Sequence, residues 1–143
     1  MPRTPRGTLP SPATYHVTSR GVARAEIFLD DEDRVEFVGL LRRVGRARRW
    51  SCHAYCLMGN HFHLLVATEI DRLSSGMQVL KGRYARSFND KYRRVGHLFQ
   101  GRFDARVLRD DEHLGTACLY VWNNPVAVGL CDRADDWPWS GRF

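Results

Sequence analysis

The sequence predicts an α+β fold in which helices cover one face of an antiparallel sheet. Four short segments are rich in β-branched and aromatic residues and are bounded by turn residues, as strands are. Two longer segments repeat apolar residues at helical spacing. The predicted strands cover residues 15–20, 50–58, 62–67 and 103–108, and the predicted helices cover about 30–49 and 74–89. The order of these strands and helices along the chain limits the number of folds that the sequence can adopt.

The first strand and the first helix have well-marked ends. Gly21 ends the strand, and the acidic run 30–33 opens the helix, where negative charge favours the positive end of the helix dipole. Arginines close the same helix, on the side where cations are favoured; they are Arg42, Arg43, Arg46, Arg48 and Arg49. The pattern between these ends is apolar on one face, so we expect this helix to pack on the sheet.

The second and third strands are predicted to form a hairpin around the turn Gly59-Asn60. The second helix and the fourth strand follow, and the acidic residues 110–112 open a last helix. That helix is predicted to stop at Pro125, because the residue before a proline is pushed away from helical angles. The aromatic tail 137–139 is expected to pack back on the core. The resulting order, β-α-β-β-α-β and one more helix, is the ferredoxin-like plan.

The chain has the length of one domain, which we place at residues 13–143, after a flexible, proline-rich and basic arm at residues 1–12. Its 22 Lys and Arg residues exceed its 16 Asp and Glu residues, so a polyanionic partner is favoured. No apolar run has membrane-spanning length, and the basic opening lacks the apolar segment of a signal peptide. We therefore expect a cytoplasmic protein that uses no membrane. Cys52 and Cys56 are predicted to be buried free thiols.

The most informative stretch is residues 60–66, because it places two histidines on one strand. Side chains alternate along a strand, so His61 and His63 point to the same face while Phe62 and Leu64 point to the other. Paired imidazoles suit a divalent metal. A pair of surface histidines would show the same spacing, so the pattern alone leaves both interpretations open.

The last helix adds a second pair, since Tyr120 and Asn124 are four residues apart and share one helix face. If that face docks near the histidines, a phenol, an amide oxygen and two imidazoles converge. Such a group suits attack of a tyrosine oxygen on a metal-bound phosphodiester, with Tyr120 as nucleophile. Taken alone, Tyr120 fits a core position and Asn124 fits a helix end.

Five segments together resemble the single-tyrosine transposases of the HUH nuclease superfamily, in particular the REP-associated tyrosine transposases. They are Tyr15–Gly21, Tyr55–Val66, Gly96–Phe103, Tyr120–Val126 and Trp137–Ser140, and the resemblance extends over about residues 14–140. Two departures stand out: Gly59 replaces the usual proline before Asn60-His61, and Trp122-Asn123 stands where His-Leu is frequent.

The resemblance implies Mg²⁺ or Mn²⁺ bound by His61, His63 and Asn124, and Tyr120 as the nucleophile. It also implies a single-stranded DNA substrate beside a hairpin, cut through a 5′-phosphotyrosine intermediate. The sequence leaves open a monomer or a homodimer that exchanges the tyrosine helix. Residues predicted to contact DNA are basic or able to stack on bases. They are Arg20, Arg24, Lys81, Arg83, Tyr84, Arg86, Arg93, Arg94, His97 and Arg102.

Three other functions are weighed against DNA strand transfer. A ferredoxin-like module can bind RNA on its sheet, but the exposed aromatic pattern of such modules is missing. A transposase-derived regulator would bind DNA without cutting it, although the full set of four site residues favours retained chemistry. A zinc hydrolase would need a further ligand, and Glu69 is the sole candidate near the histidines in sequence.

Overall fold

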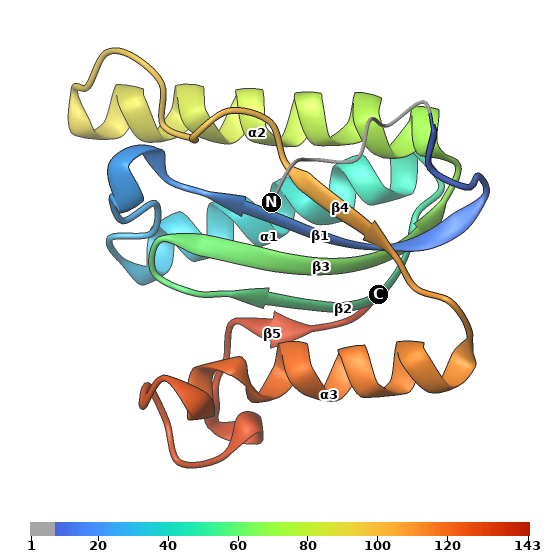
Figure 1. Cartoon of the computed structure of the whole chain (residues 1–143). Helices are drawn as coiled ribbons and strands as arrows, with labels where there is room; N and C mark the ends of the chain where they lie inside the picture. The colour runs from blue at the N-terminus through green and yellow to red at the C-terminus, as the bar shows by residue number, and fades with distance from the viewer. Residues whose placement is uncertain (1–7) are drawn as a thin grey trace.

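The computed structural model describes residues 8–143 and confirms the ferredoxin-like plan (Figure 1). The strands are β1 (Ala13–Arg20), β2 (Ser51–Leu57), β3 (His61–Thr68), β4 (Asp104–Val107) and β5 (Ser140–Gly141). The helices are α1 (Asp31–Ala47), α2 (Ile70–Tyr92) and α3 (Asp111–Ala127), with short 3-10 turns η2 (Val22–Arg24) and η3 (Ala134–Asp136). The sheet is antiparallel with the order β4-β1-β3-β2-β5, so β3 is its central strand.

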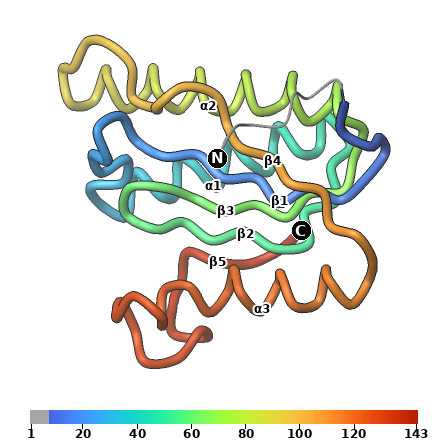
Figure 2. Tube along the Cα trace, viewed as in Figure 1, coloured from blue at the N-terminus to red at the C-terminus, as the bar shows by residue number. Residues whose placement is uncertain are grey.

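The two faces of the sheet are covered by different helices. Alternate residues of the strands, such as Val17 and Leu64, join the main core with α1 and α2. On the other face Leu65 packs with Ala117 and Val121 of α3 in a smaller cluster. The Cα trace shows α2 and α3 on opposite sides of the sheet (Figure 2). The two-helix layer was predicted, and α3 adds a third layer that gives the sheet a second covered face.

The prediction that Pro125 stops the last helix is wrong. The helix continues to Ala127, with Pro125 buried inside it. A proline removes one backbone donor, which costs most in a helix interior. Here only one further turn depends on that bond, and the carbonyl of Pro125 itself accepts the amide of Leu130 at 2.9 Å. The extra turn extends the helix beyond Asn124, which is therefore a helical residue and not a terminal one.

The C-terminal tail packs on the sheet, as predicted from its aromatic residues. Gly141 pairs with Tyr55, so β5 becomes the edge strand beside β2. The indole nitrogen of Trp137 donates to the carbonyl of Leu57 at 3.0 Å. This strand pairing and this hydrogen bond hold the tail against β2.

Residues 1–7 of the predicted arm lie outside the described residues. The described remainder, residues 8–12, contacts the domain, and the flexibility expected of the arm stays a prediction. The hydroxyl of Ser11 accepts the amide of Ile70 at 2.9 Å, and Leu9 packs on the main core. Ser11 thereby satisfies a backbone donor in the first turn of α2, and α2 begins at Ile70, earlier than the sequence predicted.

Two further expectations concern the cysteines and the membrane. Cys52 and Cys56 are buried and unpaired, and burial raises the pKa of each thiol to about 12, so both stay protonated. Within residues 8–143, no helix combines the length and the apolar character that a membrane span requires.

Candidate active site

The four residues singled out from the sequence meet in one cleft of about 420 Å³. His61 and His63 reach it from the start of β3, on the face turned away from α1 and α2. Tyr120 and Asn124 reach it from α3, which packs against that face. The cleft is lined by Thr18, Ser19, Arg20, His61, His63, Gln100, Arg102, Asp104, Tyr120 and Asn124. One chain supplies the whole set, so no second copy is needed to complete it.

His63 lies at the centre of a hydrogen-bonded chain of side chains. Its Nε2 atom lies 2.8 Å from the amide nitrogen of Asn124, and its Nδ1 atom lies 3.0 Å from Nε2 of His16. His16 belongs to β1, where Thr18 is the residue paired with His63. Because His16 of β1 and Asn124 of α3 contact the two ring nitrogens, the imidazole of His63 has little freedom to rotate.

His61 is oriented by its neighbour in sequence. Its Nδ1 atom lies 2.7 Å from the side-chain oxygen of Asn60, which accepts the ring proton. The amide nitrogen of Asn60 in turn donates to the backbone carbonyl of Arg24 at 3.3 Å. With Nδ1 protonated, the Nε2 atom of His61 keeps its lone pair for a ligand.

The electrostatics of the cleft keep both strand histidines neutral. Burial, with the nearby His61, His16 and Arg20, lowers the pKa of His63 to about 3. Burial and then Arg20 lower the pKa of His61. A metal binds imidazole in its neutral form, so both rings are prepared for coordination at neutral pH.

The phenol of Tyr120 is exposed at the mouth of the cleft. Its side chain is 59% exposed, and its ring stands edge-on to the rings of His63 and His16, with centroids 6.0 and 6.2 Å away. A core role for this tyrosine is therefore excluded. The two histidine rings contact one side of the Tyr120 ring, and the exposed side is accessible to a large substrate.

The donor set fits a divalent cation. His61 and His63 offer imidazole nitrogens, the commonest nitrogen ligands of such ions. Asn124, whose amide nitrogen lies 2.8 Å from Nε2 of His63, would add an oxygen ligand after a half-turn of its amide. No three His, Cys, Asp or Glu side chains of residues 8–143 are grouped to hold a metal, so the set depends on this amide.

Comparison with known proteins identifies the family. A family model described as "Transposase IS200 like" matches residues 11–124, which contain all four residues discussed above. The chain belongs to the IS200-like transposase family. A Haemophilus influenzae protein named as a REP-associated tyrosine transposase is 28% identical over 142 residues, covering 86% of this chain and 80% of that protein. The predicted single-tyrosine transposase is thus confirmed.

Two solved structures confirm the fold of this transposase. One, described as a REP-associated tyrosine transposase bound to a REP hairpin, has a TM-score of 0.80 at 20% identity and covers 98% of this chain and 82% of its own. The other is a Deinococcus radiodurans R1 protein described as a transposase, with a TM-score of 0.56 at 16% identity. It covers 86% of this chain and 97% of its own.

The basic residues predicted to contact DNA are divided between two regions of the transposase. Arg20 and Arg102 line the cleft. Lys81 of α2 donates to the carbonyl of Gly101 at 3.0 Å, and Gly101 is the residue before Arg102. Arg24, Arg83, Arg86, Arg93 and His97 are exposed outside the cleft, and Arg94 donates to Asn89 at 2.8 Å near the end of α2. Of the predicted DNA-contact residues, Arg20 and Arg102 are the ones that line the cleft together with Tyr120.

The prediction that Tyr84 stacks on bases is wrong. Its side chain is 1% exposed, and its hydroxyl donates to the backbone carbonyl of Ile27 inside the core. Its ring packs against Phe28, Phe37 and Phe88. Tyr84 occupies a position of α2 that faces the sheet, whereas the charged residues around it face outward.

Sequence reasoning missed several residues of the site, among them Thr18, Ser19 and Asp104 of the cleft lining. His16 and Asn60 orient the two strand histidines, and Gln100 lines the cleft. Asn60 stands directly before His61, so its neighbourhood could have signalled a role. His16 is 47 residues from His63, and only the pairing of β1 with β3 brings them together.

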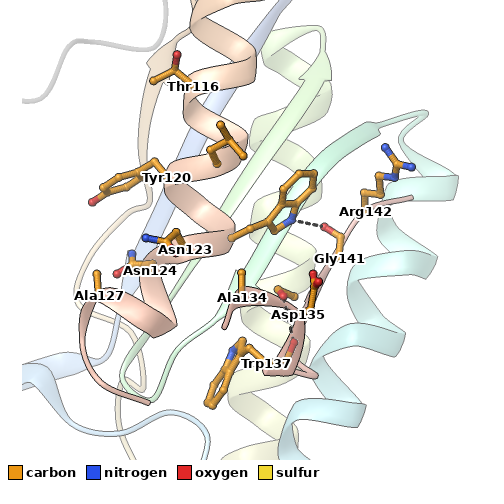
Figure 3. A pocket seen from close by; sticks show the side chains of 13 residues that line it. Thr116, Tyr120, Asn123, Asn124, Ala127, Ala134, Asp135, Trp137, Gly141 and Arg142 are labelled. Carbon is orange, nitrogen blue, oxygen red and sulfur yellow. Dashed lines mark hydrogen bonds between the residues drawn. The ribbon is translucent and has the colours of Figure 1, made fainter. Parts of the chain in front are cut away.

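A second hollow, of about 880 Å³, lies between α3 and the C-terminal segment (Figure 3). The indole nitrogen of Trp122 donates across it to the carbonyl of Gly141 at 3.2 Å. Tyr120 and Asn124 border this hollow as well as the cleft. Trp122 therefore anchors the tail to the helix that carries the tyrosine.

Proposed function

We propose that this transposase nicks and rejoins single-stranded DNA next to a hairpin, through a covalent bond to Tyr120. The observation that carries the proposal is the meeting of Tyr120, Asn124, His61 and His63 in one cleft. The substrate class is supported by the solved relative described as bound to a REP hairpin and by the curated relative named for the same elements.

The proposed chemistry begins with attack of the Tyr120 oxygen on the scissile phosphorus. The phenol gives its proton to solvent as the new O–P bond forms. That bond replaces the bond between phosphorus and the 3′ oxygen, which takes a proton from solvent and leaves as a 3′-hydroxyl. The product is a 5′-phosphotyrosine, and attack by another 3′-hydroxyl reverses the step and frees the phenol. Because one phosphodiester bond is exchanged for another, the strand is rejoined without an external energy source.

The residues around Tyr120 would hold the phosphate in place. Arg20 and Arg102 line the cleft and offer guanidinium groups that neutralise the charge developing on its oxygens. His61, His63 and Asn124 would hold Mg²⁺ or Mn²⁺, which would polarise the scissile phosphate as a Lewis acid. The edge-on packing of Tyr120 on His63 keeps the phenol next to these groups.

The nucleophile is tested with hairpin oligonucleotides that carry a single-stranded flank, incubated with Mn²⁺ and separated under denaturing conditions. Wild-type protein should give a shifted band that survives denaturant, and Tyr120→Phe should give none while binding the hairpin as before. Tyr92→Phe, which changes a tyrosine outside the cleft, is the matched control and should keep the band. An undiminished band from Tyr120→Phe would refute the proposal. Hairpin binding without a covalent product from the wild-type protein would favour a non-cleaving regulator.

The metal site is tested with His61→Ala against His53→Ala, a histidine of β2 that does not line the cleft. Cleavage by the His61 variant should be lost at every concentration of Mg²⁺ or Mn²⁺, whereas the His53 variant should cleave normally. Full cleavage by His61→Ala, or wild-type cleavage that persists in EDTA, would exclude the proposed cation site.

A further inference from the structure

His16 does not line the cleft, but its ring contacts the rings of His63 and Tyr120, which do. His16 lies on β1 opposite Leu65, and its side chain points to the face covered by α3. Its ring lies 5.3 Å from that of His63 and 6.2 Å from that of Tyr120. It therefore touches both a proposed metal ligand and the proposed nucleophile without lining the substrate cleft.

The hydrogen bonds of His63 allow two arrangements of protons. In the first, the amide of Asn124 donates to Nε2 of His63, and Nδ1–H of His63 donates to Nε2 of His16. In the second, every donor and acceptor is reversed, and Nε2 of His63 carries the proton. Only the first leaves a lone pair on Nε2, the nitrogen that faces Asn124.

We propose that His16 is a positioning residue: its Nε2 atom accepts the Nδ1 proton of His63 and thereby keeps the Nε2 lone pair of His63 directed at the Asn124 side of the cleft. This rests on the proposed function, in which His63 and Asn124 share a divalent cation. A partner on the far nitrogen of a metal-binding histidine fixes both its tautomer and its orientation.

The contact with Tyr120 extends the same role to the nucleophile. The rings of His16 and Tyr120 meet edge-on, as those of His63 and Tyr120 do, with interplanar angles of 68° and 89°. Aromatic rings favour this geometry. The rings of His16 and His63 therefore both pack against the ring of Tyr120, and removal of either ring leaves the phenol less confined.

The test compares His16→Gln with His16→Leu. The oxygen of a glutamine side chain can take the place of the His16 Nε2 atom as an acceptor, whereas leucine fills similar space and accepts nothing. The first readout is the tautomer of His63 in metal-free protein, from long-range ¹H–¹⁵N NMR spectra assigned with His63→Gln. His63 should carry its proton on Nδ1 in the wild type and in His16→Gln, and should shift towards Nε2–H in His16→Leu.

The second readout is Mn²⁺ affinity by calorimetry. His16→Leu should bind Mn²⁺ about 10–100-fold more weakly than wild type, the usual effect of losing such a partner, and His16→Gln should restore most of the affinity. Hairpin binding in EDTA should be the same for all three proteins, because His16 does not line the cleft.

Two results would overturn the role of His16: an Nε2–H tautomer of His63 in the wild type, or wild-type Mn²⁺ affinity in His16→Leu. The first needs no His16 variant, so it holds even if His16→Leu does not fold. If the tautomers behave as expected but wild-type protein binds no Mn²⁺, the proposed cation site fails while the orientation of His63 by His16 stands. The two proposals are thus separated by one set of measurements.

Discussion

Lowering the pH should destabilise the metal-free protein through His63. Its pKa is about 3 in the folded chain, against an ordinary value of 6.5, because burial and the nearby His61, His16 and Arg20 disfavour its charged form. Between these two pH values the unfolded chain binds a proton that the folded chain does not. The free energy of unfolding is therefore fully retained above pH 6.5 and falls as the pH is lowered towards 3.

The size of the effect follows from the shift. One pKa unit corresponds to about 1.4 kcal/mol, so His63 should cost about 5 kcal/mol over the whole range and about 3 kcal/mol by about pH 4.5. The pKa values of His16 and His61 are lowered as well, which steepens the loss. Since a small domain is stable by only about 5–15 kcal/mol, this is a large fraction of its stability.

Urea denaturation at a series of pH values measures this loss directly. His63→Gln is the comparison, because glutamine can keep hydrogen bonds to Asn124 and His16 but does not titrate. The wild type should lose more stability than the variant on acidification. Parallel losses in the two proteins, or an NMR titration of His63 with a pKa of 6.5 or more, would refute the reasoning.

Three further predictions follow from the fold and the charges. Tyr84→Phe should lower the free energy of unfolding by about 1–3 kcal/mol, because the buried carbonyl of Ile27 loses its donor, while hairpin affinity stays unchanged in gel shifts; weaker binding by a fully stable variant would return this ring to the DNA interface. Gly76→Ala should destabilise by about 1–3 kcal/mol in urea, because a Cβ atom would lie 2.3 Å from Cζ2 of Trp50. Gly39→Ala, where a Cβ atom meets nothing within 4 Å, should instead gain up to about 1 kcal/mol, and equal losses in both variants would contradict the packing argument. Arg20→Gln should reduce the dependence of log affinity on log salt by about one unit, the loss of one phosphate contact, whereas Arg43→Gln on α1 should not; an unchanged slope for Arg20→Gln would remove this residue from the phosphate site.

Local patterns were sufficient for most of the architecture. Acidic residues mark the starts of α1 and α3, where Asp30 and Asp110 accept amide protons as caps. The alternation of residues 61–66 placed two histidines on one face of a strand, and the four-residue spacing of Tyr120 and Asn124 placed them on one face of a helix. These periodicities arise from the backbone itself, so they can be read before any contact is known.

Long-range packing explains where the sequence interpretation failed. The face on which Tyr84 lies follows from the docking of α2 on the sheet, and it is buried although charged residues surround it in sequence. Pro125 remains inside a helix because it is buried there and only two helical residues follow it, so little of the helix depends on the missing donor. In both cases a local preference was overruled by the energy of packing.

The sequence by itself determined which side chains are the candidates for the proposed chemistry, because each pair occupies neighbouring positions of one regular element whose geometry is fixed by the backbone. Only the tertiary structure decided that the pairs meet in a single chain and that Asn124 and His16 contact the two nitrogens of His63. It also decided that Arg20 and Arg102 are the arginines of residues 8–143 that line the cleft. Those arrangements depend on how β1 pairs with β3 and on how α3 lies across the sheet. The strand pairing and the helix packing both join segments that are far apart in the chain. They are stabilised by the burial of side chains from these distant segments, which no local sequence pattern connects.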